Sequence, residues 1–206
     1  MSIKDRSRLD DHYSREARKE GYPARSVFKL AEFDQKYRLF RPGQKVLDLG
    51  CAPGSWTLYT AEKVGPGGLV VGLDLSVPPG SFPGNVRLLA GDLLKDEEWI
   101  DEILALTGSG LEAVLSDLAP KTSGRREVDQ ARSLELVEAA WSWTKKLLTP
   151  GGLFLFKLFQ SQDGEDYIKT IRPYFGQIVR LKPKATRKNS QEIFILGRGF
   201  IRLTDC

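Results

Sequence analysis

Short apolar segments of strand length alternate with segments of helical pattern through the middle of the chain, and this alternation restricts the fold more than any other feature. The apolar segments read KVLDLG, LVVGLDL, VRLLAGD, AVLSDLAP and LFLFKLF. Each is continuously apolar, which is typical of parallel strands buried on both faces. Helices are expected between them, over 56–63, 97–106 and 131–148. The alternation therefore predicts an α/β fold with a doubly wound, mostly parallel sheet and helices on both faces.

Two more apolar segments, QIVRLKP and EIFILGRGF, follow a helix expected near 164–175. The loop between them, 181–191, is too short for a crossover helix, so the two strands are expected to pair antiparallel. The last strand should then run against the parallel strands. Its first residues, Gln191 and Glu192, are expected at the edge where the parallel strands end.

The chain of 206 residues is expected to form one domain, since single domains commonly have roughly 100–200 residues. Residues 1–41 are expected to be a basic helical extension and 42–206 the core. Within the extension, a charged helix should end at Gly21, and a second helix should begin at Pro23 and reach Tyr37.

Several classes of protein are disfavoured by the composition. No apolar run approaches the roughly 18–20 residues that span a bilayer, and the charged N-terminal segment lacks the apolar stretch of a secretory signal, so a cytoplasmic protein is expected. The two cysteines, Cys51 and Cys206, stand outside any CxxC motif. His12 is the single histidine, so neither a metal site nor a Ser-His-Asp triad is expected.

The net charge of +4 conceals an uneven distribution. Residues 1–41 hold 11 Lys and Arg against 7 Asp and Glu, 42–177 hold 13 against 18, and 178–202 hold 7 against 1. Basic ends around an acidic middle indicate a surface that contacts a polyanion, although an ordinary solvated surface explains the composition equally well.

The predicted strands end in glycine or polar residues at one edge of the sheet. Asp74, Asp92 and Asp117 follow the second, third and fourth strands, and Lys157 lies near the end of the fifth. Ligands of open α/β sheets bind beyond the carboxyl ends of the strands. A binding site is therefore predicted at this edge.

The loop DLGCAPGSW after the first strand favours a nucleoside ligand without phosphates. Gly50 and Gly54 let the backbone approach a ligand closely, whereas Pro53 lacks the N–H that a pyrophosphate site would use. Asp74 is placed to bind ribose hydroxyls and Asp92 to accept from the exocyclic amine of adenine, although either could be a helix cap. S-adenosylmethionine (SAM) fits this pattern better than NAD, because GxGxxG is absent and a sulfonium suits acidic surroundings.

Taken in order, these motifs resemble the FtsJ/RrmJ family of RNA ribose 2′-O-methyltransferases, of the type that methylates large-subunit ribosomal RNA. The resemblance covers nearly the whole chain through DHYSREARKEGYPARSVFKL, VLDLGCAPGSW, SDLAPKTSG, GGLFLFKLFQ and RKNSQEIFILG. It implies a Rossmann-like, SAM-dependent methyltransferase fold with a seven-stranded sheet whose last strand is antiparallel. Ser55 stands where the family commonly has a second glycine. Because serine is small and caps helices well, we expect cofactor binding to persist.

The resemblance also implies a catalytic Lys–Asp–Lys–Glu tetrad, at Lys29, Asp117, Lys157 and Glu192. The residues assigned to the cofactor are Gly50, Gly54, Trp56, Asp74, Asp92 and Asp117. Lys157 is the candidate acceptor of the 2′-hydroxyl proton, since a lysine inside LFLFKLF is costly to bury without purpose. An amine accepts a proton only when neutral, so electrostatic positioning of the hydroxyl by a charged Lys157 is the open alternative.

The basic ends are expected to bind RNA, and the expected substrate is a uridine ribose in 23S ribosomal RNA, methylated by a monomer. The candidate RNA-binding residues are Arg15, Arg18, Lys19, Arg25, Lys182 and Arg187. A tRNA or mRNA-cap methyltransferase of the same family would share the tetrad. A catalytically silent RNA-binding module should lack part of it, and a Rossmann dehydrogenase should carry GxGxxG and bind NAD.

Overall fold

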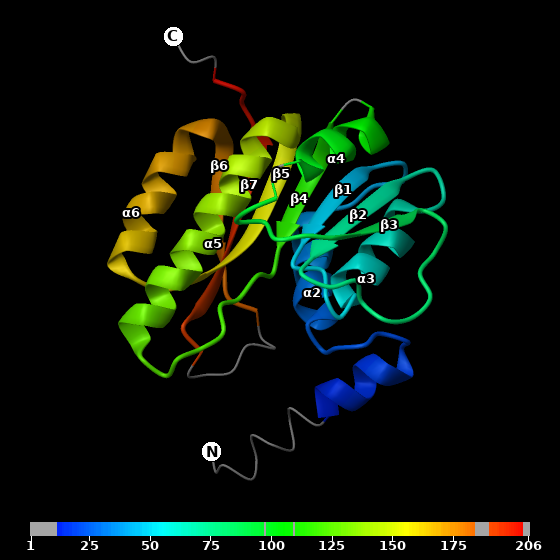
Figure 1. The fold of residues 1–206 in the computed structure, drawn as a ribbon, viewed down its shortest axis with the longest axis horizontal. Coiled ribbons are helices and arrows are strands. Elements are labelled where there is room, and N and C mark those ends of the chain that lie inside the picture. The colour runs from blue at the N-terminus through cyan, green and yellow to red at the C-terminus, as the bar shows by residue number, and fades with distance from the viewer. Residues whose placement is uncertain (1–11, 97, 109, 184–189, 204–206) are drawn as a thin grey trace.

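The computed structural model describes residues 12–96, 98–108, 110–183 and 190–203. One seven-stranded sheet runs through it in the order β3-β2-β1-β4-β5-β7-β6 (Figure 1). The strands are β1 Lys45–Leu49, β2 Leu69–Asp74, β3 Val86–Ala90, β4 Leu111–Ser116, β5 Leu148–Phe159, β6 Phe175–Leu181 and β7 Glu192–Phe200. A helix over 12–19 is followed by α2 Val27–Tyr37, α3 Ser55–Val64, α4 Trp99–Thr107, α5 Arg126–Leu147 and α6 Gln162–Ile171, with a 3-10 turn at Arg172–Tyr174.

The sheet confirms the predicted topology. β1 pairs in parallel with β2 and β4, and the parallel pairing continues to β3 on one side and β5 on the other. β7 lies antiparallel between β5 and β6. The chain therefore changes direction across the sheet between β1 and β4, and the carboxyl ends of the parallel strands meet at the lower edge in Figure 1.

Alternate residues of the strands supply two hydrophobic layers. Phe154 and Phe156 of β5 face the layer covered by α4, α5 and α6, where the Trp141 ring stacks 6.1 Å from that of Phe154. Leu155, between them, faces the opposite layer together with Phe194 of β7, and α2 and α3 cover that side. Because the central strands β1, β4 and β5 are buried on both faces, they read as nearly continuous apolar runs. No helix among the described residues is long and apolar enough to cross a membrane.

The second N-terminal helix begins later than expected. Residues 12–19 form a helix as predicted, but α2 begins at Val27 rather than at Pro23. The segment between them is a turn in which the N–H of Ala24 donates to Ser55 Oγ at 2.7 Å. The Ala24 N–H is thus satisfied by a tertiary hydrogen bond, which a prediction from the local sequence pattern does not include.

The long helix α5 begins earlier than expected, whereas its end agrees with the prediction within one residue. α5 begins at Arg126 rather than at 131, because its first turn is mostly charged and carries a single apolar residue, Val128. It ends at Leu147, and β5 follows at once. Pro150 to Gly152, which would be expected to end a helix, therefore lie inside a strand.

Candidate active site at the carboxyl ends of the strands

The loop between β1 and α3 depends on glycine at both predicted positions. Gly50 and Gly54 have φ angles of 77° and 107°, which side chains rarely tolerate. A Cβ on Gly50 would lie 2.6 Å from Leu118 Cδ2, and one on Gly54 would lie 2.7 Å from Phe82 Cζ. The loop is therefore closely surrounded, and no larger residue fits at either position without displacing a neighbour.

Asp74 and Asp92, which sequence analysis assigned to the cofactor, hold loops at this edge. Asp74 Oδ2 accepts from the N–H of Ala52 at 2.9 Å, which ties the end of β2 to the loop after β1. Asp92 Oδ1 accepts from the N–H of Leu94 at 3.0 Å, and Oδ2 pairs with Lys95 Nζ at 3.0 Å. The Leu94 N–H and the Lys95 ammonium hold the pKa of Asp92 below its usual range, so this carboxylate stays an ionised acceptor.

Asp48 belongs to this region, and sequence analysis missed it. Its side chain is fully buried under α3, where Thr57 Oγ1 donates to Oδ2 at 2.6 Å and Oδ1 has no partner among the described residues. Burial, with smaller contributions from the carboxylates of Asp117 and Asp74, raises the pKa of Asp48 to about 7, although the Thr57 hydrogen bond lowers it. The aspartate inside the apolar run KVLDLG was the available signal.

Two ion pairs bring the four predicted tetrad residues to the same edge. Lys157 Nζ donates to Asp117 Oδ1 at 2.8 Å and to the Asp117 carbonyl at 2.5 Å, and its side chain is only 7% exposed. Lys29 Nζ pairs with Glu192 Oε1 at 2.5 Å. The residues come from β5, the end of β4, α2 and the start of β7.

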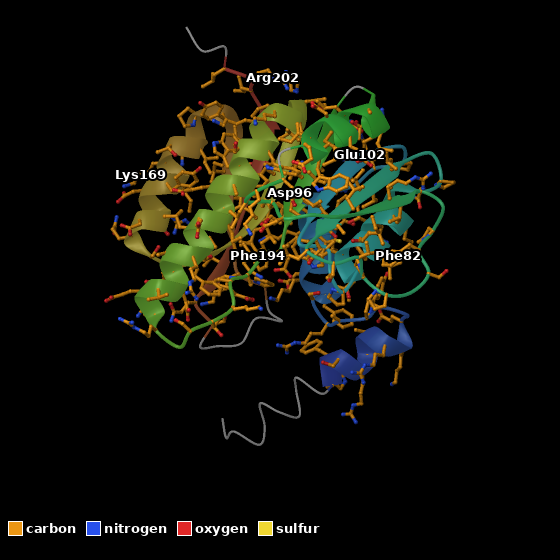
Figure 2. All side chains as sticks on the ribbon, viewed as in Figure 1. Phe82, Asp96, Glu102, Lys169, Phe194 and Arg202 are labelled. Carbon is orange, nitrogen blue, oxygen red and sulfur yellow. The ribbon has the colours of Figure 1, made fainter. Side chains whose placement is uncertain are left out.

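Phe194 connects the two pairs. It lies opposite Lys157 in the β5–β7 register, and Lys29 Nζ lies 5.4 Å from the centre of its ring. Figure 2 labels Phe194 near the middle of the molecule. The Phe33 ring of α2 lies 5.2 Å from it, so the helix that carries Lys29 is held against the strands that carry Lys157 and Glu192.

Ser55 and Trp56, at the start of α3, hold the segment that precedes α2. Gly54 is the N-cap of α3, so the expectation that Ser55 caps the helix is wrong. Ser55 is 1% exposed, and its hydroxyl accepts from the N–H of Ala24. The indole of Trp56 is 3% exposed and donates to the Ser26 carbonyl at 2.9 Å. The side chains of Ser55 and Trp56 thus position the segment that leads to Lys29.

Only three of the predicted RNA-binding residues lie together on one element of the structure. Arg15, Arg18 and Lys19 are exposed on the helix 12–19, which extends below the sheet beside α2 and α3 in Figure 1. Arg25 is half-buried in the turn before α2, and Lys182 is exposed just after β6. The predicted contact at Arg187 lies outside the described residues.

Comparisons with known proteins agree with this architecture. The family model described as FtsJ-like methyltransferase matches residues 22–200. The chain is 44% identical over 188 residues to ribosomal RNA large subunit methyltransferase E of Desulfatibacillum aliphaticivorans, covering 91% of this chain and 89% of that protein. It is 45% identical over 196 residues to the protein of the same name from Coxiella burnetii, covering 93% and 91%.

A solved structure from Plasmodium falciparum, described as a ribosomal RNA methyltransferase, superposes with a TM-score of 0.76. It is 24% identical and is matched over 87% of this chain and 98% of its own. At this level of identity the likeness shows the fold.

Proposed function

The chain belongs to the FtsJ-like methyltransferase family, and we propose that it transfers the methyl group of SAM to a ribose 2′-hydroxyl of large-subunit ribosomal RNA. The observation that carries the proposal is the buried Lys157 ammonium paired with Asp117 where β4 and β5 end. Burying a lysine is costly, and a functional edge of an α/β sheet is the place where that cost is justified. The relatives named for large-subunit ribosomal RNA support the choice of substrate.

The residues at the cofactor side of the edge fit SAM. Gly50 and Gly54 hold the loop in a backbone conformation that side chains rarely adopt, and the carboxylates of Asp74 and Asp117 lie close enough to Asp48 to raise its pKa. Such an electronegative site favours a cationic nucleoside over a pyrophosphate. Asp74 and Asp92 would hold the nucleoside, with the backbone around Gly54 and Trp56. When bound, SAM supplies a methyl group that a nucleophilic oxygen can attack.

The four tetrad residues are expected to act on the RNA substrate. The ribose hydroxyl must lose its proton as its oxygen acquires the methyl group. Lys157 is the residue that we place at this hydroxyl, with Asp117 fixing its direction and the Lys29–Glu192 pair holding the neighbouring part of the substrate. Lys157 Nζ donates to two oxygens of Asp117, which fixes its direction and supports electrostatic positioning of the hydroxyl over proton acceptance.

The pH dependence of Lys157→Arg distinguishes these two roles of the lysine. Arginine keeps the positive charge but does not lose its proton in proteins. A variant that retains much of the transfer rate, with an unchanged pH profile, supports positioning. A variant that loses transfer over the whole pH range, although it folds and binds SAM, supports proton acceptance.

RNA binding is assigned to the extension 1–41 and to the exposed cations near β6. Arg15, Arg18 and Lys19 are exposed on one helix, and the arm that follows leads directly to Lys29. We expect one chain to act as a monomer, since the tetrad is completed by residues of a single chain.

Transfer of labelled methyl from SAM to separated RNA classes tests the proposed substrate. RNA is taken from cells that lack the activity, and large-subunit ribosomal RNA, tRNA and capped mRNA are offered in parallel. We expect label in the large-subunit RNA, on a uridine. Label confined to tRNA or to the cap would refute the ribosomal assignment, and RNA binding without any transfer would identify a silent RNA-binding module.

A further inference from the structure

A cavity of about 620 Å³ opens at the edge of the sheet remote from the tetrad, where the parallel strands begin. This is the upper edge, marked in Figure 2 by Arg202 just beyond β7. Across the sheet, Leu153, Arg198 and Gln177 are direct neighbours in β5, β7 and β6, and all three line the cavity. The segment after α2 forms another part of the lining.

Three arginines from separate parts of the chain line this cavity: Arg38, Arg41 and Arg198. Arg38 is the C-cap of α2 and has a φ of 51°, in the left-handed region where glycine is the usual residue. An arginine there strains the backbone in a way that glycine would avoid. The strained position nevertheless places a guanidinium at the cavity.

The charge around the cavity is positive. Glu112 is the carboxylate among the lining residues, and both its oxygens are engaged. Oε1 pairs with Arg41 at 2.5 Å, and Oε2 accepts from the N–H of Lys45 at 2.9 Å. Within the described part of the chain, Arg38 and Arg198 have no carboxylate partner, so two guanidinium charges remain for a ligand.

The remaining lining suits an extended anion. Gly151, Gly152, Gly176 and Gly199 line the cavity without side chains, so polar backbone lies close to its surface. Gln44 and Gln177 add amide groups. Guanidinium groups bind phosphate in two-pronged fashion, and amides and backbone N–H groups donate to its other oxygens.

We propose that this cavity binds a phosphodiester segment of the RNA substrate at a distance from the methylated nucleotide. The inference rests on the proposed function, because it takes the substrate to be a long RNA. Leu153 in the cavity lies four residues before Lys157 on β5, roughly 13 Å along the strand. The edge strand β6 runs from Gln177 at the cavity to Leu181, and exposed Lys182 follows toward the tetrad edge. RNA that lies along β6 can therefore contact both the cavity and the tetrad.

A charge-removing double variant, Arg38→Gln with Arg198→Gln, tests the proposal. The matched control, Arg87→Gln with Lys169→Gln, removes two exposed cations from β3 and α6, away from the cavity. Binding of large-subunit RNA is measured over a range of salt concentrations, because each lost phosphate contact lowers the logarithmic salt slope by about 0.7–0.9. Methyl transfer is measured on the long RNA and on a short oligonucleotide that carries the target.

We expect the cavity variant to lose about one to two units of salt slope and to raise KM for the long RNA about three- to tenfold. Its kcat, its SAM affinity and its KM for the oligonucleotide should match those of the control. Equal slopes and equal KM values in the two double variants would overturn the proposal. The proposal would also be overturned if binding of a free nucleoside monophosphate depended on Arg38 and Arg198 while binding of RNA did not.

The wild-type protein keeps the two proposals separable. If wild type transfers methyl to the long RNA and the two double variants bind it equally, the cavity proposal fails and the function stands. If wild type transfers no methyl but the cavity variant still loses salt slope, the proposed function fails and the RNA contact at the cavity stands.

Discussion

The edge of the sheet that carries the tetrad has two halves, and they differ in the charge of their side chains. At the ends of β1 and β2, glycines allow a tight and closely packed loop, and the charged side chains are carboxylates. Beneath the ends of β4, β5 and β7, two lysines are each paired with an acid. An electronegative site suits a cation, and fixed ammonium groups suit an RNA backbone and a developing alkoxide. Cofactor affinity and transfer rate should therefore respond to different substitutions.

Lys157→Met should produce the largest effect, confined to chemistry. It removes the buried ammonium that contacts Asp117, so the single-turnover rate of methyl transfer should fall by about 10²–10⁴. SAM affinity, measured by calorimetry, should change by less than about threefold, since the side chain lies outside the glycine loop. Lys169→Met, on exposed α6, is the control. A rate within a few-fold of wild type would contradict the assigned role.

Gly54→Val should produce the complementary effect. The φ of 107° and the Phe82 ring leave no room for a side chain, so the loop must move and SAM affinity should fall by at least about tenfold. RNA affinity measured without SAM should be unchanged. Gly67→Val is the control, because a Cβ there meets nothing within 4 Å. A variant that binds SAM normally would show that this loop does not hold the cofactor.

Ser55→Ala should give a smaller effect, in which a change beside the glycine-containing loop weakens binding of RNA. It leaves the N–H of Ala24 without its acceptor and loosens the arm that leads to Lys29. KM for RNA should rise about two- to fivefold, while SAM affinity and kcat at saturating RNA stay nearly constant. A variant that loses SAM affinity instead would place Ser55 with the cofactor.

Asp48→Asn should alter stability rather than transfer to RNA, and its effect should depend on pH. Because the pKa of Asp48 is raised from 3.8 to about 7, wild type loses stability as pH rises between about 4 and 7. Asparagine does not titrate and can still accept from Thr57. The Tm of the variant minus the Tm of wild type should therefore be larger at pH 8 than at pH 5 in thermal melts. A pH-independent difference in Tm would contradict the raised pKa.

The halves also differ in how far the sequence predicted them. The strands, Gly50, Gly54 and Asp74 follow from local patterns, because a loop after a parallel strand uses residues adjacent in the chain. The strand pattern placed Asp117, Lys157 and Glu192 at this edge, but their grouping with Lys29 as a tetrad came from the family resemblance. Lys29 and Glu192 are 163 positions apart, and only the tertiary fold brings them together.

Three features escaped prediction for the same physical reason. The hydroxyl of Ser55 was expected to cap its own helix and instead binds a backbone group 31 positions away. The buried Asp48 was hidden inside a strand that otherwise reads as apolar. The arginine cavity combines the end of α2 with the far ends of β5, β6 and β7. Each depends on tertiary contacts that no local pattern encodes.

Identification of the methylated nucleoside tests the central claim most directly. Large-subunit ribosomal RNA is incubated with the protein and methyl-labelled SAM, digested to nucleosides and analysed by mass spectrometry, with Lys157→Met in parallel. We predict a labelled 2′-O-methylated nucleoside with wild type and at least about a hundredfold less with the variant. Label on a base carbon or nitrogen, or equal ribose labelling by the variant, would contradict the account.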